Sequence, residues 1–160
     1  IHNPPIRGLT LAVKEPIGVI ASILNNQFPL LSLVTILASN FATGNANIII
    51  PAEKTSLIAS EMYRLLETSD IPEGYINILT SKQDSLNKII SEHESIDGVW
   101  LFSESDNERK KVINYSVSNL KRYWCPKAKN VDWLNNEEIF LNEFLYESTQ
   151  IKNIWIPYGE

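Results

Sequence analysis

The sequence predicts an α/β fold: a Rossmann-like open parallel sheet of about five strands with helices on both faces, plus a short C-terminal helix-strand tail. Short runs rich in β-branched residues alternate with longer stretches in which apolar residues recur at helical spacing. Those stretches are long enough to form right-handed crossovers between parallel strands. The chain has 160 residues, of which 44% are hydrophobic, so it can bury a single core.

The first predicted strand and helix flank a polar turn. Residues 17–23 follow a proline and are rich in isoleucine, which favours a strand. The segment NNQ at 25–27 consists of typical turn residues. Residues 28–41 are apolar nearly all round, which predicts a helix covered on most sides, and Gly44 supplies its C-terminal stop.

The middle of the chain continues the alternation. Three consecutive isoleucines within residues 47–50 predict a buried strand, and residues 55–67 carry their apolar side chains on one helical face. A turn at 71–74 precedes a third strand at 75–79, and a weaker helical pattern follows at 84–91.

The last part of the sheet is predicted from residues 98–102 as a strand, 105–117 as a helix and 120–124 as a fifth strand. These assignments complete the repeating strand-helix pattern that is typical of a parallel sheet.

The pattern changes after residue 124, where the chain becomes polar and irregular. A helix is then predicted at 137–147 and a short strand at 151–156. We therefore divide the chain into a Rossmann-type domain at 1–124 and a C-terminal tail at 125–160.

Composition excludes several classes of function. The formal net charge is −5, with 14 basic and 19 acidic residues, which argues against a nucleic-acid partner. The longest apolar run, 28–38, is interrupted by Ser32 and Thr35 and is too short to span a membrane. A single cysteine, Cys125, favours a reducing, cytoplasmic setting. Two histidines and one cysteine lie far apart in the sequence, so we predict no metal site.

Five sequence blocks carry a family resemblance, and they are KEPIGVIASI, NNQFPLL, GNANIIIPAE, IPEGYINILT and IDGVWLF. In order and spacing, from residue 14 to about residue 124, they resemble the cofactor-binding region of the aldehyde dehydrogenase superfamily. The short tail and the ending KNIWIPYGE are most similar to the degenerate C-terminal region of aldehyde dehydrogenase family 16. This resemblance implies that a fuller dehydrogenase region lies upstream in a longer chain.

The resemblance also implies roles for two positions. In the family, an asparagine of the second block donates a hydrogen bond to the developing oxyanion, and Gln27 stands at that position here. Its side chain is one methylene longer, so we expect a vestigial oxyanion position or a plain polar turn. The family's cofactor-binding lysine is replaced by Ile50, which leaves Glu53 as a vestigial ribose-binding residue or an ordinary acidic residue near a helix start.

The segment after the fourth strand departs furthest from the family pattern. The resemblance implies a glycine turn there, where backbone N–H groups approach the cofactor's pyrophosphate. Ser103 and Glu108 replace the glycines, and Glu104 and Asp106 add negative charge that repels phosphate. The same residues fit a capped helix, because Ser105 and Glu108 have the spacing of a capping box.

The family's catalytic groups are missing from this segment. The position of the general-base glutamate falls on Tyr123 or Trp124, and Cys125 comes too early in the chain to be the nucleophile. We therefore predict no catalytic residue in this segment and no bound cofactor, with NAD as the cofactor if any site is retained.

These substitutions predict a non-catalytic structural or interaction module of a longer protein. The predicted partner is the upstream dehydrogenase region of the same chain or another subunit in an oligomer. One alternative is a part of an NAD-dependent oxidoreductase that converts an aldehyde to a carboxylic acid and has its catalytic cysteine elsewhere in the full-length chain. Another is retained mononucleotide or metabolite binding without catalysis.

Overall fold

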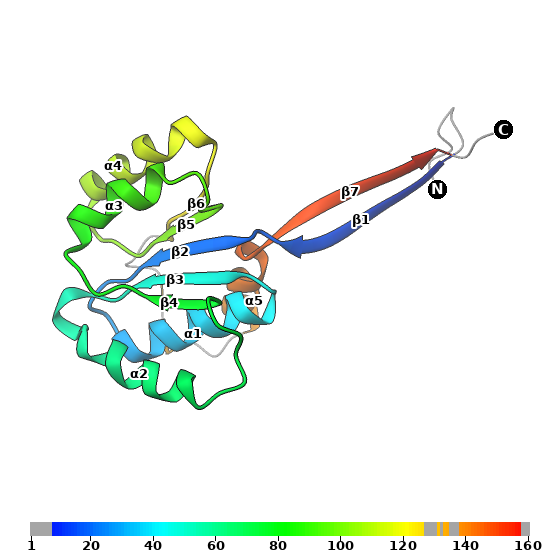
Figure 1. Ribbon diagram of the computed structural model, residues 1–160. Helices are drawn as coiled ribbons and strands as arrows, with labels where there is room; N and C mark the ends of the chain where they lie inside the picture. The colour runs from blue at the N-terminus through cyan, green and yellow to red at the C-terminus, as the bar shows by residue number, and fades with distance from the viewer. Residues whose placement is uncertain (1–7, 127–130, 132, 135–137, 158–160) are drawn as a thin grey trace.

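The structure is a computed structural model that describes residues 8–126, 131, 133–134 and 138–157. It consists of a parallel five-stranded sheet between two layers of helices, from which a two-stranded ribbon projects (Figure 1). The predicted α/β class with a parallel sheet of five strands is therefore confirmed.

The order of the strands in the sheet is β4-β3-β2-β5-β6. The chain adds strands outward from β2 on one side and then crosses back to place β5 and β6 on the other side. The loops after β2 and β5 consequently diverge at the carboxyl edge of the sheet, where open α/β sheets bind ligands. The strands are β2 Val19–Ile23, β3 Ala46–Ile50, β4 Ile76–Ile78, β5 Gly98–Leu101 and β6 Arg122–Trp124.

The helices form two layers, with α3 and α4 on one face of the sheet and α1, α2 and α5 on the other (Figure 1). In the part of the chain that the structure describes, no helix combines the length and the apolar character needed to cross a lipid bilayer. The α-helices are α1 Pro29–Ala42, α2 Leu57–Glu67, α3 Gln83–Glu92, α4 Asp106–Ser116 and α5 Glu138–Glu147, and short 3-10 turns occur at Glu53–Thr55 and Val117–Asn119.

An aromatic cluster joins the tail to the sheet. Phe144 of α5 is 2% exposed and lies within 5.1–6.4 Å, centroid to centroid, of the rings of Trp100, Phe102, Trp124 and Trp133. Most of these pairs meet edge-on or tilted, which are favourable arrangements for aromatic rings. The helix after the irregular segment is thus held on the sheet by buried aromatic contacts.

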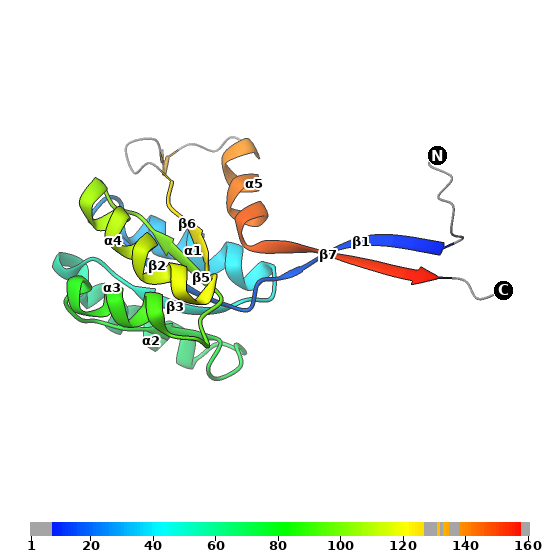
Figure 2. The ribbon, with the colours of Figure 1, turned by 90° about the horizontal axis from the view of Figure 1, so that it is seen from above.

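The ribbon pairs β1 (Gly8–Pro16) with β7 (Thr149–Pro157) in antiparallel register and extends away from the body (Figure 2). The predicted C-terminal strand is confirmed, whereas β1 was missed. A signal for β1 was present, because Leu9, Leu11 and Val13 alternate with other residues at the period of a strand.

Candidate functional site

The carboxyl ends of β2 and β5 border a cavity of about 350 Å³. The loop after β2 contributes Asn25, Asn26 and Gln27, and the loop after β5 contributes Ser103 and Glu104. The polar residues singled out in the sequence therefore meet at one edge of the sheet, next to the start of α4.

Gln27 is held by other residues of the loops. Its side-chain amide donates to Glu104 Oε1 at 2.8 Å, and its backbone N–H donates to Asn25 Oδ1 at 3.0 Å. The second bond closes an Asx turn, as expected for a polar turn. The next residue, Phe28, has a left-handed backbone with φ of 45° immediately before Pro29 of α1. The Gln27 amide is engaged with a carboxylate, and its oxyanion role stays a prediction.

Glu53 stabilises the start of α3. Its Oε1 accepts a hydrogen bond from the backbone N–H of Gln83 at 3.1 Å, which satisfies a free donor at the helix N-terminus. Gln83 in turn donates from Nε2 to the carbonyl of Leu24 at 2.6 Å. Ile50, at the position of the family's lysine, is fully buried in the sheet. These contacts join the ends of β2 and β3 to α3, and a ribose contact by Glu53 stays a prediction.

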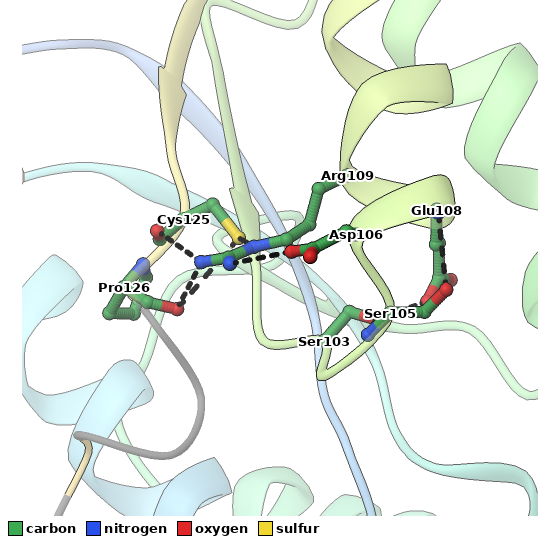
Figure 3. A network of polar contacts seen from close by, with 7 residues as sticks. All are labelled: Ser103, Ser105, Asp106, Glu108, Arg109, Cys125 and Pro126. Carbon is green, nitrogen blue, oxygen red and sulfur yellow. Dashed lines mark hydrogen bonds and ion pairs between the residues drawn. The ribbon is translucent and has the colours of Figure 1, made fainter.

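The start of α4 is capped, although not by the predicted reciprocal pair. Ser105 Oγ accepts from the backbone N–H of Glu108 at 3.3 Å, as predicted. The second bond of a capping box, from the Ser105 N–H to the Glu108 carboxylate, is not formed. Instead, the Ser105 N–H donates to Ser103 Oγ at 3.1 Å, and the Ser103 hydroxyl donates to Glu108 Oε2 (Figure 3). The other carboxylate oxygen accepts from Asn87 Nδ2 at 2.9 Å. Ser103 therefore completes the cap because its short side chain reaches both groups.

Arg109 extends toward the end of β6 and binds Cys125 and Pro126 there (Figure 3). Its Nε donates to Cys125 Sγ at 2.9 Å, and its Nη2 donates to the carbonyls of Cys125 at 3.0 Å and Pro126 at 3.1 Å. The hydrogen bond with Cys125 raises the pKa of Arg109 above its usual value, against the opposing effect of burial. Cys125 thus links β6 to α4, a contact that the sequence did not indicate.

Tyr123 and Trp124, the positions nearest to the family's general base, lie on β6. Trp124 belongs to the aromatic cluster, with its ring centroid 4.7 Å from that of Trp100. The Tyr123 hydroxyl is buried without a hydrogen-bond partner in the described part of the chain. The pKa of Tyr123 is raised well above its usual range, mainly by burial and to a smaller extent by the neighbouring Cys125. Neither side chain supplies a carboxylate base. Within the described ranges, we also find no group of three or more His, Cys, Asp or Glu residues arranged to hold a metal.

The chain belongs to the aldehyde dehydrogenase family, whose family model matches residues 4–125. This match covers the whole parallel sheet and the cavity at its carboxyl edge.

Individual relatives agree with this assignment. The chain is 32% identical over 116 residues to the NADP/NAD-dependent aldehyde dehydrogenase PuuC of Escherichia coli, covering 72% of this chain and 23% of that protein. It is 36% identical over 115 residues to aldehyde dehydrogenase family 2 member C4 of Arabidopsis thaliana, again covering 72% and 23%. The solved aldehyde dehydrogenase KauB of Pseudomonas aeruginosa superposes with a TM-score of 0.70 and 32% identity, over 78% of this chain and 25% of that one. The chain thus spans about a quarter of the length of these relatives.

Proposed function

We propose that this chain is a non-catalytic aldehyde-dehydrogenase-like module with a structural or interaction role in a longer protein, most similar to the C-terminal region of family 16. The arrangement at the start of α4 supports this proposal most directly. Ser103 and Glu108 carry side chains where the family has glycines, and the backbone N–H groups of Ser105 and Glu108 already donate to Ser103 and Ser105.

A dinucleotide can bind at that turn only if the backbone N–H groups are free and accessible. Its pyrophosphate approaches free N–H groups closely, and glycine permits this approach because it has no side chain. Here Glu104 and Glu108 line the same cavity, so a phosphate would meet like charges. At an effective dielectric constant of about 20, one unit-charge pair 4 Å apart costs about 4 kcal/mol. We therefore propose no bound cofactor, and NAD remains the cofactor to test.

The ribbon supports the interaction role. The antiparallel register places Leu9, Leu11 and Val13 on the same face as Ile154 and Ile156, and the two strands have no further strand beside them in the described structure. The three β1 residues are 40–47% exposed. Isolated two-stranded ribbons are marginally stable in water, and exposed strand edges readily pair with another chain. We propose that this apolar ribbon face binds another subunit.

Calorimetric titration of the purified chain with NAD is expected to show no saturable heat, because the α4 turn offers carboxylates to the phosphates. A micromolar dissociation constant would contradict the proposed function. A Glu108→Gln variant is the informative companion, since it removes one charge while retaining hydrogen-bonding groups. If charge alone closes the site, weak NAD binding should emerge in that variant.

Sedimentation velocity tests the ribbon. The wild-type chain is expected to associate as concentration rises, whereas Leu11→Lys should remain monomeric because a charge enters the centre of the apolar face. Leu57→Lys on α2 is the control, because Leu57 is 83% exposed on the body. Equal association of all three proteins, or monomers throughout, would refute the proposed role of the ribbon.

The catalytic alternative receives support from the relatives, which include NAD-dependent aldehyde dehydrogenases. In that reading the chain is part of an NAD-dependent aldehyde oxidoreductase whose cysteine lies elsewhere in the full-length protein. Aldehyde-dependent NADH production by the full-length protein that is lost on Gln27→Ala would favour it. Production that is unaffected by Gln27→Ala would assign the activity to another region.

A further inference from the structure

One edge of the parallel sheet ends at β4, which has no further strand beside it in the described structure (Figure 1). Tyr75 and Leu79, at the two ends of β4, form backbone hydrogen bonds with β3. The backbone groups of successive residues point to opposite sides of a strand. The N–H and C=O groups of Ile76 and Ile78 consequently face the open edge, where another strand could pair with them.

Tyr63 of α2 covers part of this edge. Its hydroxyl donates to the carbonyl of Ile78 at 3.0 Å and accepts from the backbone N–H of Ile78 at 2.8 Å. A tyrosine hydroxyl is both a donor and an acceptor, so it satisfies these two groups as a residue of a neighbouring strand would. Ile76 and Tyr63 also line a surface hollow of about 200 Å³, so this part of the edge can be reached from solvent.

The sequence of β4 offers little other protection against pairing. Residues 75–79, YINIL, contain no charged residue and no proline, which natural sheets commonly use to keep edge strands apart. Tyr75 and Leu79 add exposed apolar surface on either side of the strand. Apart from the short length of the strand, the Tyr63 hydroxyl is therefore the group that keeps this edge from pairing.

We propose that the β4 edge is a self-association surface that the Tyr63 hydroxyl holds closed, and that its occupant is β4 of a second copy of this chain. Antiparallel pairing about a two-fold axis at Asn77 places Ile76 of each copy opposite Ile78 of the other. Both residues face outward, so each such pair exchanges both of its N–H···O bonds. Tyr63 occupies the Ile78 groups, so pairing requires its hydroxyl to leave. This inference goes beyond the role proposed for the ribbon and does not depend on it.

The test is Tyr63→Phe, which removes the hydroxyl and retains the ring. It is made in the Leu11→Lys background, so that the apolar ribbon face does not contribute. Sedimentation velocity should show a discrete dimer at concentrations where the parent is monomeric. Adding Asn77→Lys should restore the monomer, because like charges then lie directly opposite each other at the two-fold axis. Tyr75→Phe, which removes the hydroxyl of an exposed tyrosine beside the same strand, should leave the parent unchanged.

Amide hydrogen exchange tests the closed edge in the wild-type chain. The N–H of Ile78 should exchange more slowly than that of Ile76. In Tyr63→Phe at low concentration, exchange at Ile78 should become about tenfold faster, as expected for the loss of one hydrogen bond. Circular dichroism checks that each variant is folded, and if Tyr63→Phe is not, exchange in the wild-type chain decides.

The proposal is overturned if Ile76 and Ile78 exchange equally fast in the wild-type chain, or if folded Tyr63→Phe stays monomeric. Aggregates of mixed size in place of a dimer, or a dimer that persists with Asn77→Lys, would also overturn it. The role of the ribbon is decided separately, by comparing the wild-type chain with Leu11→Lys alone, so the two can fail independently.

Discussion

Replacing Phe144 by alanine is expected to lower the free energy of unfolding by about 3–5 kcal/mol, as is usual for a buried phenylalanine. Phe144 is 2% exposed and lies among Trp100, Phe102, Trp124 and Trp133. Its removal leaves a cavity lined by large rigid rings, which collapse poorly into the space.

Urea unfolding followed by tryptophan fluorescence measures this effect. The tryptophans of the cluster should report the loss directly, and the dependence on urea should keep the same slope if unfolding remains two-state. Leu141→Ala on the same helix is the matched control, because Leu141 is 50% exposed. Its cost should be less than about 1 kcal/mol. Equal losses in both variants would show that the helix, rather than the ring cluster, determines stability.

Phe144 also matters for the proposed function, because α5 leads directly into β7. The backbone carbonyl of Ser148, between the two elements, accepts a hydrogen bond from Asn45 Nδ2 at 2.8 Å. Arg122 Nη1 donates to the carbonyl of Thr149, the first residue of β7, at 3.0 Å. Weak packing of α5 would leave these two hydrogen bonds to hold the base of the ribbon. We therefore expect the ribbon and the aromatic cluster to be coupled, because Phe144 lies near the C-terminal end of α5 and its carbonyl accepts the backbone N–H of Ser148 at 3.0 Å.

The strands of the parallel sheet and the helices between them were predictable, because each is indicated by the pattern of neighbouring residues. The isoleucines of β3 and the one-sided apolar pattern of α2 predict their elements directly, and the strand and helix limits agree with the structure to within two residues where it describes them. The capping serine at 105 was also readable, since its spacing to Glu108 is a property of the sequence alone.

The remaining contacts depend on residues far apart in the chain. Local periodicity cannot show that β1 pairs with β7, because the two strands lie at opposite ends of the chain. The residues of β1 alternate as in a strand, but they do not pack into the core of the sheet, so the pattern alone is weak evidence. Asn87 of α3 donates to Glu108 of α4, and Arg109 of α4 donates to Cys125, which follows β6. Such contacts are set by the tertiary arrangement, so the sequence indicated candidate residues without identifying their partners.

Gly18→Ala is expected to lower the free energy of unfolding by about 3–4 kcal/mol, which combines backbone strain with overpacking. Gly18 has φ of +129°, a conformation that residues with side chains rarely adopt. A Cβ there would lie 2.2 Å from Asp97 Oδ2. That oxygen cannot simply move aside, because it accepts the backbone N–H of Val19 at 2.8 Å at the start of β2.

Two comparisons separate the causes of this loss. Gly74 also has a positive φ, of +83°, but an added Cβ would meet nothing within 4 Å, so Gly74→Ala should cost only about 1–2 kcal/mol. In an Asp97→Ala background the clash at Gly18 disappears, so Gly18→Ala should cost less than in the wild type but still more than Gly74→Ala, because alanine adopts a φ of +129° less readily than one of +83°. Chemical denaturation of the single and double variants gives both numbers. An undiminished loss in the Asp97→Ala background would assign the whole effect to backbone conformation, and the close approach of β2 to Asp97 would then have no part in the requirement for glycine.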